Sequence, residues 1–112
     1  MIVGYTTGVY DLFHIGHVAM LRNAKSMCDK LIVGVTTDEL VAYKNKKAVI
    51  PFEERLEIVK ACRYCDLAVP QVSMNKMDAW KRYKFNKMFV GDDWYKTKKW
   101  EKFETEFKEV NV

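Results

Sequence analysis

The first 36 residues contain two strand-like segments on either side of one amphipathic helix, and this order limits the fold more than any other feature. Residues 1–6 and 31–35 are rich in β-branched residues, which favour strands. A helix over about 16–28 is predicted by apolar residues at helical spacing, namely Val18, Leu21, Ala24 and Cys28. A strand, helix and strand in so short a stretch form a βαβ crossover, which predicts a parallel sheet.

The alternation of strands and helices continues along the chain. Pro51 suits the first turn of a helix, and the acidic Glu53 and Glu54 suit the positive end of its dipole. Patterning predicts helices over 51–62, 77–83 and 97–107, strands over 66–70 and 87–91, and the start of a fifth strand at 109–112. We therefore predict an α/β protein with a Rossmann-like, three-layer architecture.

The size and composition of the chain fit one globular domain. It has 112 residues, of which 49% are hydrophobic and 30% charged, and this balance excludes a disordered or collagen-like chain. No apolar run approaches the roughly 20 residues that cross a bilayer, and the first residues show no basic n-region or cleavage site of a signal peptide. We expect a cytoplasmic protein that does not engage a membrane.

The three cysteines do not predict a metal site. Cys62 and Cys65 have CxxC spacing, but no second pair or histidine partner follows, and Cys28 stands alone. Because all three lie in apolar stretches, we expect buried or half-buried thiols, with redox or metal chemistry as the minor alternative.

Basic residues gather in the second half of the chain. Residues 76–102 contain nine Lys or Arg and four Asp or Glu, although the net charge of the whole chain is only +4. The basic, aromatic stretch 80–85 could stack nucleic-acid bases, but aromatics at helical spacing more often pack in a core or interface. We expect no nucleic-acid partner.

The junction between the first strand and the first helix carries a candidate site. Ligands of parallel sheets bind beyond the carboxyl ends of the strands, where the positive N-terminus of a helix attracts anions. His14 and His17 flank Gly16 at this junction, and glycine lets the backbone approach a ligand closely. Two imidazoles here could donate to phosphate oxygens and stabilise charge that develops during phosphoryl transfer.

The motif His14-Ile15-Gly16-His17 resembles the HxGH signature of the nucleotidyltransferase superfamily, to which cytidylyltransferases and class I aminoacyl-tRNA synthetases belong. Further segments make the chain similar to bacterial glycerol-3-phosphate cytidylyltransferases over nearly its whole length. These segments are residues 8–17, 36–39, 44–47, 63–66 and 91–94. The resemblance implies transfer of a cytidylyl group from CTP to glycerol 3-phosphate, giving CDP-glycerol and pyrophosphate.

The resemblance also implies roles for individual residues. The backbone of Val9 and Tyr10 would approach the nucleotide. The segment from His14 through Ile15 and Gly16 to His17 would bind the triphosphate and act in catalysis.

Basic and acidic residues further along the chain would complete the site. Lys44 would bind the acceptor phosphate and Lys46 the CTP phosphates, and both lysines would act in catalysis. Lys76 is a second acceptor lysine if a one-residue shift is allowed. Arg63, Asp66 and Asp93 would serve the nucleoside, although a strand-end aspartate is an equal alternative for Asp66.

Two departures from the resembled family affect the expected site. A threonine of the family's first loop is Val9 here, and the family's Arg-Thr-x-Gly-Ile-Ser-Thr motif, which closes over the CTP phosphates, has no counterpart before the chain ends. We therefore expect residues 1–112 to form a single cytidylyltransferase-like domain that lacks its C-terminal strand and this motif. The resemblance implies a homodimer, and we expect Mg²⁺ to be carried with CTP, with no metal site of the protein's own.

Three other functions remain open from the residues. The acceptor could be phosphocholine, phosphoethanolamine or a sugar phosphate, and the nucleotide could be ATP, because backbone contacts choose the base. The chain could also be a nucleotide-sensing module without turnover.

Overall fold

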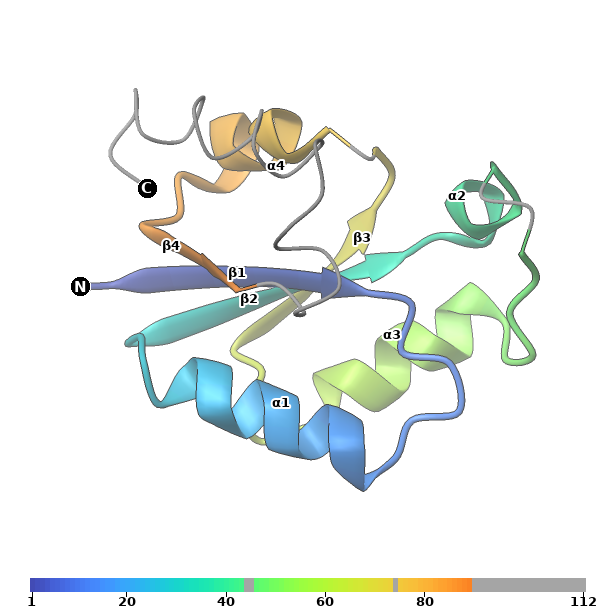
Figure 1. Ribbon diagram of the computed structural model, residues 1–112, viewed down its shortest axis with the longest axis horizontal. Helices are drawn as coiled ribbons and strands as arrows, with labels where there is room; N and C mark the ends of the chain where they lie inside the picture. Colours follow the sequence, from blue (N-terminus) through green and yellow to red (C-terminus); the bar gives the residue numbers. More distant parts are fainter. Residues whose placement is uncertain (44–45, 74, 90–112) are drawn as a thin grey trace.

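The computed structural model describes residues 1–43, 46–73 and 75–89, whose arrangement is shown in Figure 1. Within these residues, four parallel strands form one sheet in the order β3-β2-β1-β4. Helices α1 and α3 cover one face and α4 covers the other (Figure 1), which confirms the predicted α/β, Rossmann-like fold. The elements are β1 (Val3–Gly8), α1 (Ile15–Lys25), β2 (Lys30–Thr36), α2 (Asp38–Tyr43), α3 (Phe52–Lys60), β3 (Leu67–Gln71), α4 (Lys76–Tyr83) and β4 (Lys87–Phe89).

The order of the strands places a topological switch beside β1. The chain adds β2 and then β3 on one side of β1, and it returns to add β4 on the other side. In open parallel sheets, ligands bind outside the carboxyl ends of the strands at such a switch point. The loop that follows β1 lies at this place.

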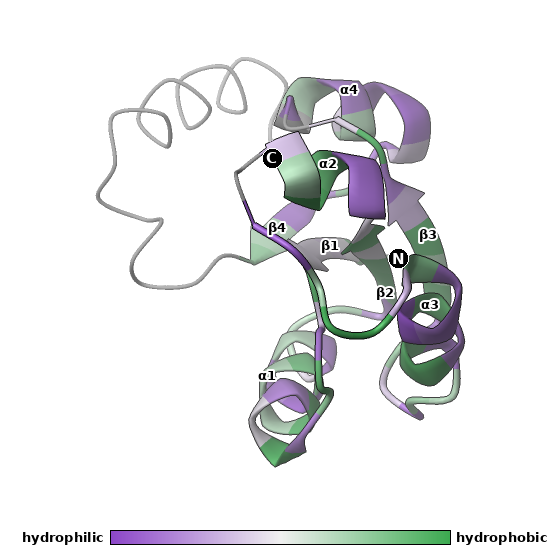
Figure 2. Ribbon diagram, turned by 90° about the vertical axis from the view of Figure 1, so that its right-hand side faces the viewer, coloured by the Kyte–Doolittle hydropathy of each residue, from purple (hydrophilic) through white to green (hydrophobic). Residues whose placement is uncertain are grey.

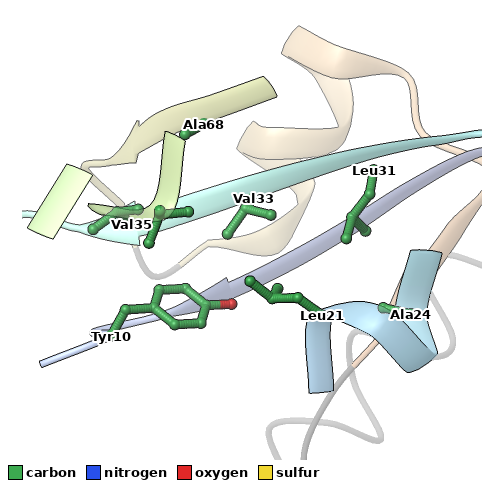
Figure 3. Packing of buried hydrophobic residues seen from close by; sticks show 8 residues of the cluster. Tyr10, Leu21, Ala24, Leu31, Val33, Val35 and Ala68 are labelled. Carbon is green, nitrogen blue, oxygen red and sulfur yellow. The ribbon is translucent and has the colours of Figure 1, made fainter. Parts of the chain in front are cut away.

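Two apolar clusters hold the three layers together. Between the sheet and α1 and α3, the side chains of Leu21, Leu31, Val33 and Val59 are fully buried, and Figure 3 shows part of this cluster. Under α4, the ring of Tyr5 stacks on that of Phe85 with centroids 4.8 Å apart. Figure 2 shows hydrophobic and hydrophilic stretches alternating along α3 and α4, as expected of helices that cover a sheet with one side.

The predicted strands and helices are found with shifted ends. The first strand runs to Gly8 rather than residue 6, because its last two residues pair with Gly34 and Val35. The sequence did not predict α2, whose six residues are too few to show a helical period. The helix predicted over 97–107, the strand at 109–112 and the last two residues of the strand over 87–91 lie outside the described residues.

The cysteines are free and half-buried, as predicted for Cys28, Cys62 and Cys65. Burial raises the pKa of the Cys65 thiol to about 11, so it is a weak nucleophile at neutral pH. Within the described ranges, no helix has the length and apolar character needed to span a bilayer.

Candidate active site

The loop between β1 and α1 has a constrained backbone. Tyr10 and Leu12 adopt left-handed conformations with φ of 54° and 50°, which cost non-glycine residues roughly 1–2 kcal/mol each. The Tyr10 side chain is only 3% exposed, and Figure 3 shows its ring extending toward Leu21 in the core. Strain of this kind persists where surrounding contacts enforce it, and it is concentrated at functional sites.

The two histidines close the N-terminus of α1 by a reciprocal pair of hydrogen bonds. The N–H of Gly16 donates to Nδ1 of His14 at 3.0 Å, and the N–H of His14 donates to Nδ1 of His17 at 3.1 Å. The carbonyl of His14 accepts from the N–H groups of His17 and Val18. The amides of Gly16, His17 and Val18 therefore already have partners within the chain, although the N-terminus of this helix was expected to attract an anion.

This capping arrangement determines which ring nitrogen carries the proton. A nitrogen that accepts a backbone N–H has no proton of its own, so each neutral ring is protonated on Nε2. The ring centroids of His14 and His17 are 4.2 Å apart. The site therefore presents two neighbouring Nε2–H donors of fixed tautomer.

His17 is packed among aromatic rings. It stacks on Phe13 with centroids 5.2 Å apart, and Tyr10 meets it edge-on at 5.6 Å. Burial, and then the nearby His14, lower the pKa of His17 below its ordinary value. His17 is therefore a neutral donor at pH 7.

Gly16 is required by the histidine ahead of it. A Cβ atom at this position would lie 2.7 Å from Cε1 and 3.0 Å from Nδ1 of His14. Any side chain here would push the ring of His14 away from the Gly16 N–H. The motif's glycine thus serves the cap directly, beyond the close approach of a ligand.

The other residues near this loop that were expected to contact the nucleotide differ in how accessible they are to a ligand. The carbonyl of Val9 already accepts a hydrogen bond at 2.8 Å from Nη1 of Arg55. The side chain of Ile15 is 75% exposed. The Tyr10 side chain is committed to the core, so only its backbone can face a ligand.

The predicted lysines are only partly described. Lys46 follows α2 with an exposed side chain, and its N–H donates to the carbonyl of Val41 at 3.3 Å. Lys44 and Asp93 lie outside the described residues, and for Lys76 only the backbone, at the start of α4, is described.

Arg63 and Asp66 are not brought to the histidines within one chain. Both precede β3, at the amino edge of the sheet, whereas the histidines follow β1 at the carboxyl edge. The Asp66 carboxylate accepts from Nζ of Lys25 at 2.5 Å and from the N–H of Leu31 at 2.7 Å. Asp66 thus has the strand-end role that was the alternative from the sequence, and neither Asp66 nor Arg63 belongs to the proposed site.

Arg55 is a residue of this region that was not among those expected from the sequence. Its side chain is fully buried and pairs with Asp38, with Nη2 and Oδ1 2.6 Å apart. It lies four residues before the buried Val59 on α3, where the pattern calls for an apolar residue. A charged residue on the buried face of a helix was the available signal.

The comparisons with known proteins agree with this architecture. A family model described as cytidylyltransferase-like matches residues 5–112. A glycerol-3-phosphate cytidylyltransferase from Staphylococcus aureus is 38% identical over 80% of this chain and 68% of its own. An FAD synthase from Pyrococcus horikoshii is 39% identical over 77% of this chain and 60% of its own.

A solved structure shares the fold over the whole chain. The lipopolysaccharide core biosynthesis protein from Thermoplasma volcanium superposes with a TM-score of 0.87 and 23% identity, covering 100% of this chain and 90% of that one. The family match and the identity to the staphylococcal enzyme confirm the resemblance that the sequence motifs indicated. The chain belongs to the cytidylyltransferase-like family of nucleotidyltransferases.

Proposed function

We propose that this nucleotidyltransferase transfers the cytidylyl group of CTP to glycerol 3-phosphate, releasing pyrophosphate and forming CDP-glycerol. The observation that carries the proposal is the pair of Nε2–H donors held by the reciprocal cap at the topological switch. Similarity to the staphylococcal glycerol-3-phosphate cytidylyltransferase supports this choice of substrates.

The reaction is a single in-line displacement. A phosphate oxygen of glycerol 3-phosphate attacks the α-phosphorus of CTP, and the bond from that phosphorus to the bridging oxygen of pyrophosphate breaks. The electron pair of that bond leaves with pyrophosphate, so no covalent intermediate on the protein is needed. The main barrier is bringing two anions together and stabilising the charge that moves onto the leaving oxygens.

His14 and His17 are the proposed donors to these oxygens. Their tautomers and orientations are set by α1 before any substrate binds, so little reorganisation is needed during the reaction. Preorganised donors of this kind are typically worth about 3–4 kcal/mol each in the transition state.

Lysines would supply the positive charge that lets the two anions approach. By resemblance, Lys46 contacts the CTP phosphates, and Lys44 and Lys76 contact the acceptor phosphate. Mg²⁺ enters with the triphosphate as part of the substrate. Across residues 1–43, 46–73 and 75–89 there is no group of three His, Cys, Asp or Glu side chains that would hold a metal separately.

The direct test is a product assay. The chain is incubated with CTP, Mg²⁺ and a panel of phosphorylated alcohols, and products are identified by mass spectrometry alongside pyrophosphate release. We expect CDP-glycerol from glycerol 3-phosphate, formed at least about 100-fold more slowly when either histidine is replaced. Tight binding of CTP without any product would contradict the proposal and support the sensing module.

A second candidate is nucleotidyl transfer with another nucleotide or acceptor. It is favoured by the 39% identity to a protein named an FAD synthase. Replacing CTP with ATP, GTP or UTP across the same acceptor panel separates the two candidates, because only the first predicts a strict need for both CTP and glycerol 3-phosphate.

A further inference from the structure

One buried guanidinium joins four segments of the chain at the carboxyl edge of the sheet. Nη2 of Arg55 donates to Asp38, and its other hydrogen bonds go to main-chain carbonyls. These carbonyls belong to Ile50 at 2.8 Å from Nε, and to Val9 at 2.8 Å and Thr36 at 2.7 Å from Nη1. A single side chain thus connects the histidine loop, the end of β2, the start of α2 and the segment that precedes α3.

Two carboxylates also accept hydrogen bonds from the segment that precedes α3. The Asp11 carboxylate accepts from the N–H groups of Val49 at 2.8 Å and Ile50 at 2.9 Å, and the Asp38 carboxylate accepts from the N–H of Phe52 at 3.1 Å. The two N–H groups that donate to Asp11 are the main reason that its pKa is lowered. Asp11 lies three residues before His14, so the segment is bound directly to the histidine loop.

Stability alone is a weak explanation for a charge at position 55. A buried guanidinium loses its hydration, and apolar residues of similar volume often stabilise a core as well or better. What an apolar residue cannot do is bind the carbonyls of three separate segments. The particular effect of Arg55 is therefore to hold irregular backbone in one relative position.

That relative position joins the two halves of the proposed site. Lys46 lies three residues before Val49, on the segment that Asp11 and Arg55 hold. His14 and His17 lie on the loop that supplies Asp11. A misplacement of about 1 Å between reacting groups lowers rates by roughly 100-fold.

We propose that Arg55 and Asp11 are positioning residues that hold Lys46 at a set place relative to His14 and His17. The roles of Lys46 and the histidines rest on the proposed function, whereas the fastening of the segment rests on the contacts alone. Arg55→Lys keeps the charge but loses the planar fork that reaches several acceptors at once. Asp11→Asn keeps the shape but replaces one accepting oxygen with a donor that opposes an N–H.

The first test does not depend on activity. Amide hydrogen exchange of the full chain is compared between the wild type, Asp11→Asn and the control Glu54→Gln, which removes an exposed carboxylate from the same helix as Arg55. We expect the amides of Val49 and Ile50 to exchange at least about tenfold faster in Asp11→Asn only, with β1 and β2 unchanged. Unchanged exchange at these two amides would overturn the proposal.

The second test asks whether Asp11 acts through Lys46. A double-mutant cycle compares kcat/KM for Asp11→Asn, Lys46→Ala and the double variant. We expect Asp11→Asn to lower kcat/KM by about 10- to 100-fold in the wild type and by less than about threefold once Lys46 is alanine. Equal losses in both backgrounds would show that Asp11 does not position Lys46.

Arg55→Lys is tested beside it, with circular dichroism to verify folding. We expect kcat/KM to fall at least about tenfold although the charge is kept, and full activity would remove Arg55 from the proposal. If Arg55→Lys does not fold, the double-mutant cycle of Asp11 and Lys46 still tests whether the fastened segment positions Lys46. If the wild type makes no CDP-glycerol, the proposed function and the catalytic role of Lys46 are overturned. Faster amide exchange in Asp11→Asn would even then support the conclusion that Asp11 holds the segment before α3.

Discussion

Two ion pairs of nearly equal length lie at opposite edges of the sheet, and their surroundings differ. Arg55 and Asp38 are 2.6 Å apart at the carboxyl edge, where the guanidinium is fully buried and 49% of the Asp38 side chain is exposed. Lys25 and Asp66 are 2.5 Å apart at the amino edge, where 29% of the Lys25 side chain and 36% of the Asp66 side chain are exposed. The distance between charges therefore says little about what a pair does, and its surroundings say much more.

The two edges of the sheet also differ in how side chains hold the backbone there. At the amino edge, short turns bring the chain into the strands, and Asp66 satisfies one backbone N–H, that of Leu31. At the carboxyl edge, irregular loops are held by Arg55, Asp11 and the histidine cap. If this difference reflects function, substitutions at the carboxyl edge should affect turnover strongly, and those at the amino edge should not.

The largest effect is expected from removing a histidine donor while keeping its cap. In His14→Asn and His17→Asn, the side-chain oxygen can replace Nδ1 as the acceptor, but the Nε2–H is lost. We expect kcat to fall by about two to four orders of magnitude with an unchanged melting temperature. Steady-state rates and thermal melts measure this, and near-normal kcat in either variant would remove that histidine from the mechanism.

The next largest effect concerns the buried guanidinium. Arg55→Met leaves three main-chain carbonyls without their donor, so we expect the free energy of unfolding to fall by about 3–5 kcal/mol. Urea denaturation at pH 7 measures this loss. A variant as stable as the wild type would mean that the loops can close without the guanidinium, and the contrast between the edges would disappear.

A pH effect on stability is expected from His17. Its pKa is lowered in the folded state, so below about pH 6.5 the unfolded chain takes up this proton more readily than the folded one. Stability should therefore decline as the pH falls from 6.5 through the folded pKa. Melting curves from pH 8 to 5 should show a smaller decline in His17→Asn, and parallel declines would contradict this origin.

The smallest effect is expected at the amino edge. Lys25→Met removes the exposed pair but leaves the hydrogen bond from Leu31 to Asp66 in place. We expect a loss of less than about 1 kcal/mol in unfolding free energy and a change in kcat of less than about twofold. A large loss of turnover in this variant would show that the amino edge takes part in the reaction.

The strand, helix and strand at the start of the chain could be predicted because their apolar periodicity matches what is buried. The cap and its tautomers could not be predicted, since they depend on how the His14 ring turns back onto Gly16. Arg63 and Asp66 illustrate another limit of sequence-based prediction. A family resemblance indicates which residues correspond, but it does not give the distances between them in the folded chain. The predicted strand over 66–70 already placed Asp66 at a strand start, which is the edge opposite the histidines.

Arg55 had only a weak signal in the pattern, since a charge on a helix is ordinarily solvent-exposed. Its partners are main-chain carbonyls, which every residue has, so no particular residue type signals them. Asp11 had a weak signal, because it lies within the segment 8–17 that carries the family resemblance. Its contact with the N–H groups of Val49 and Ile50 required the folded chain.

The order of the strands has a consequence for how this chain reaches its folded state. In β1, Gly4 pairs with Leu31 on one side and with Lys87, far later in the chain, on the other. The loop that closes the first pairing is much shorter and costs less entropy, so we expect β1, α1 and β2 to assemble early. Until α4 and β4 emerge from the ribosome, Tyr5 and Ile32 lack their cover of Phe85 and its neighbours, and the nascent chain is most prone to aggregation in that interval.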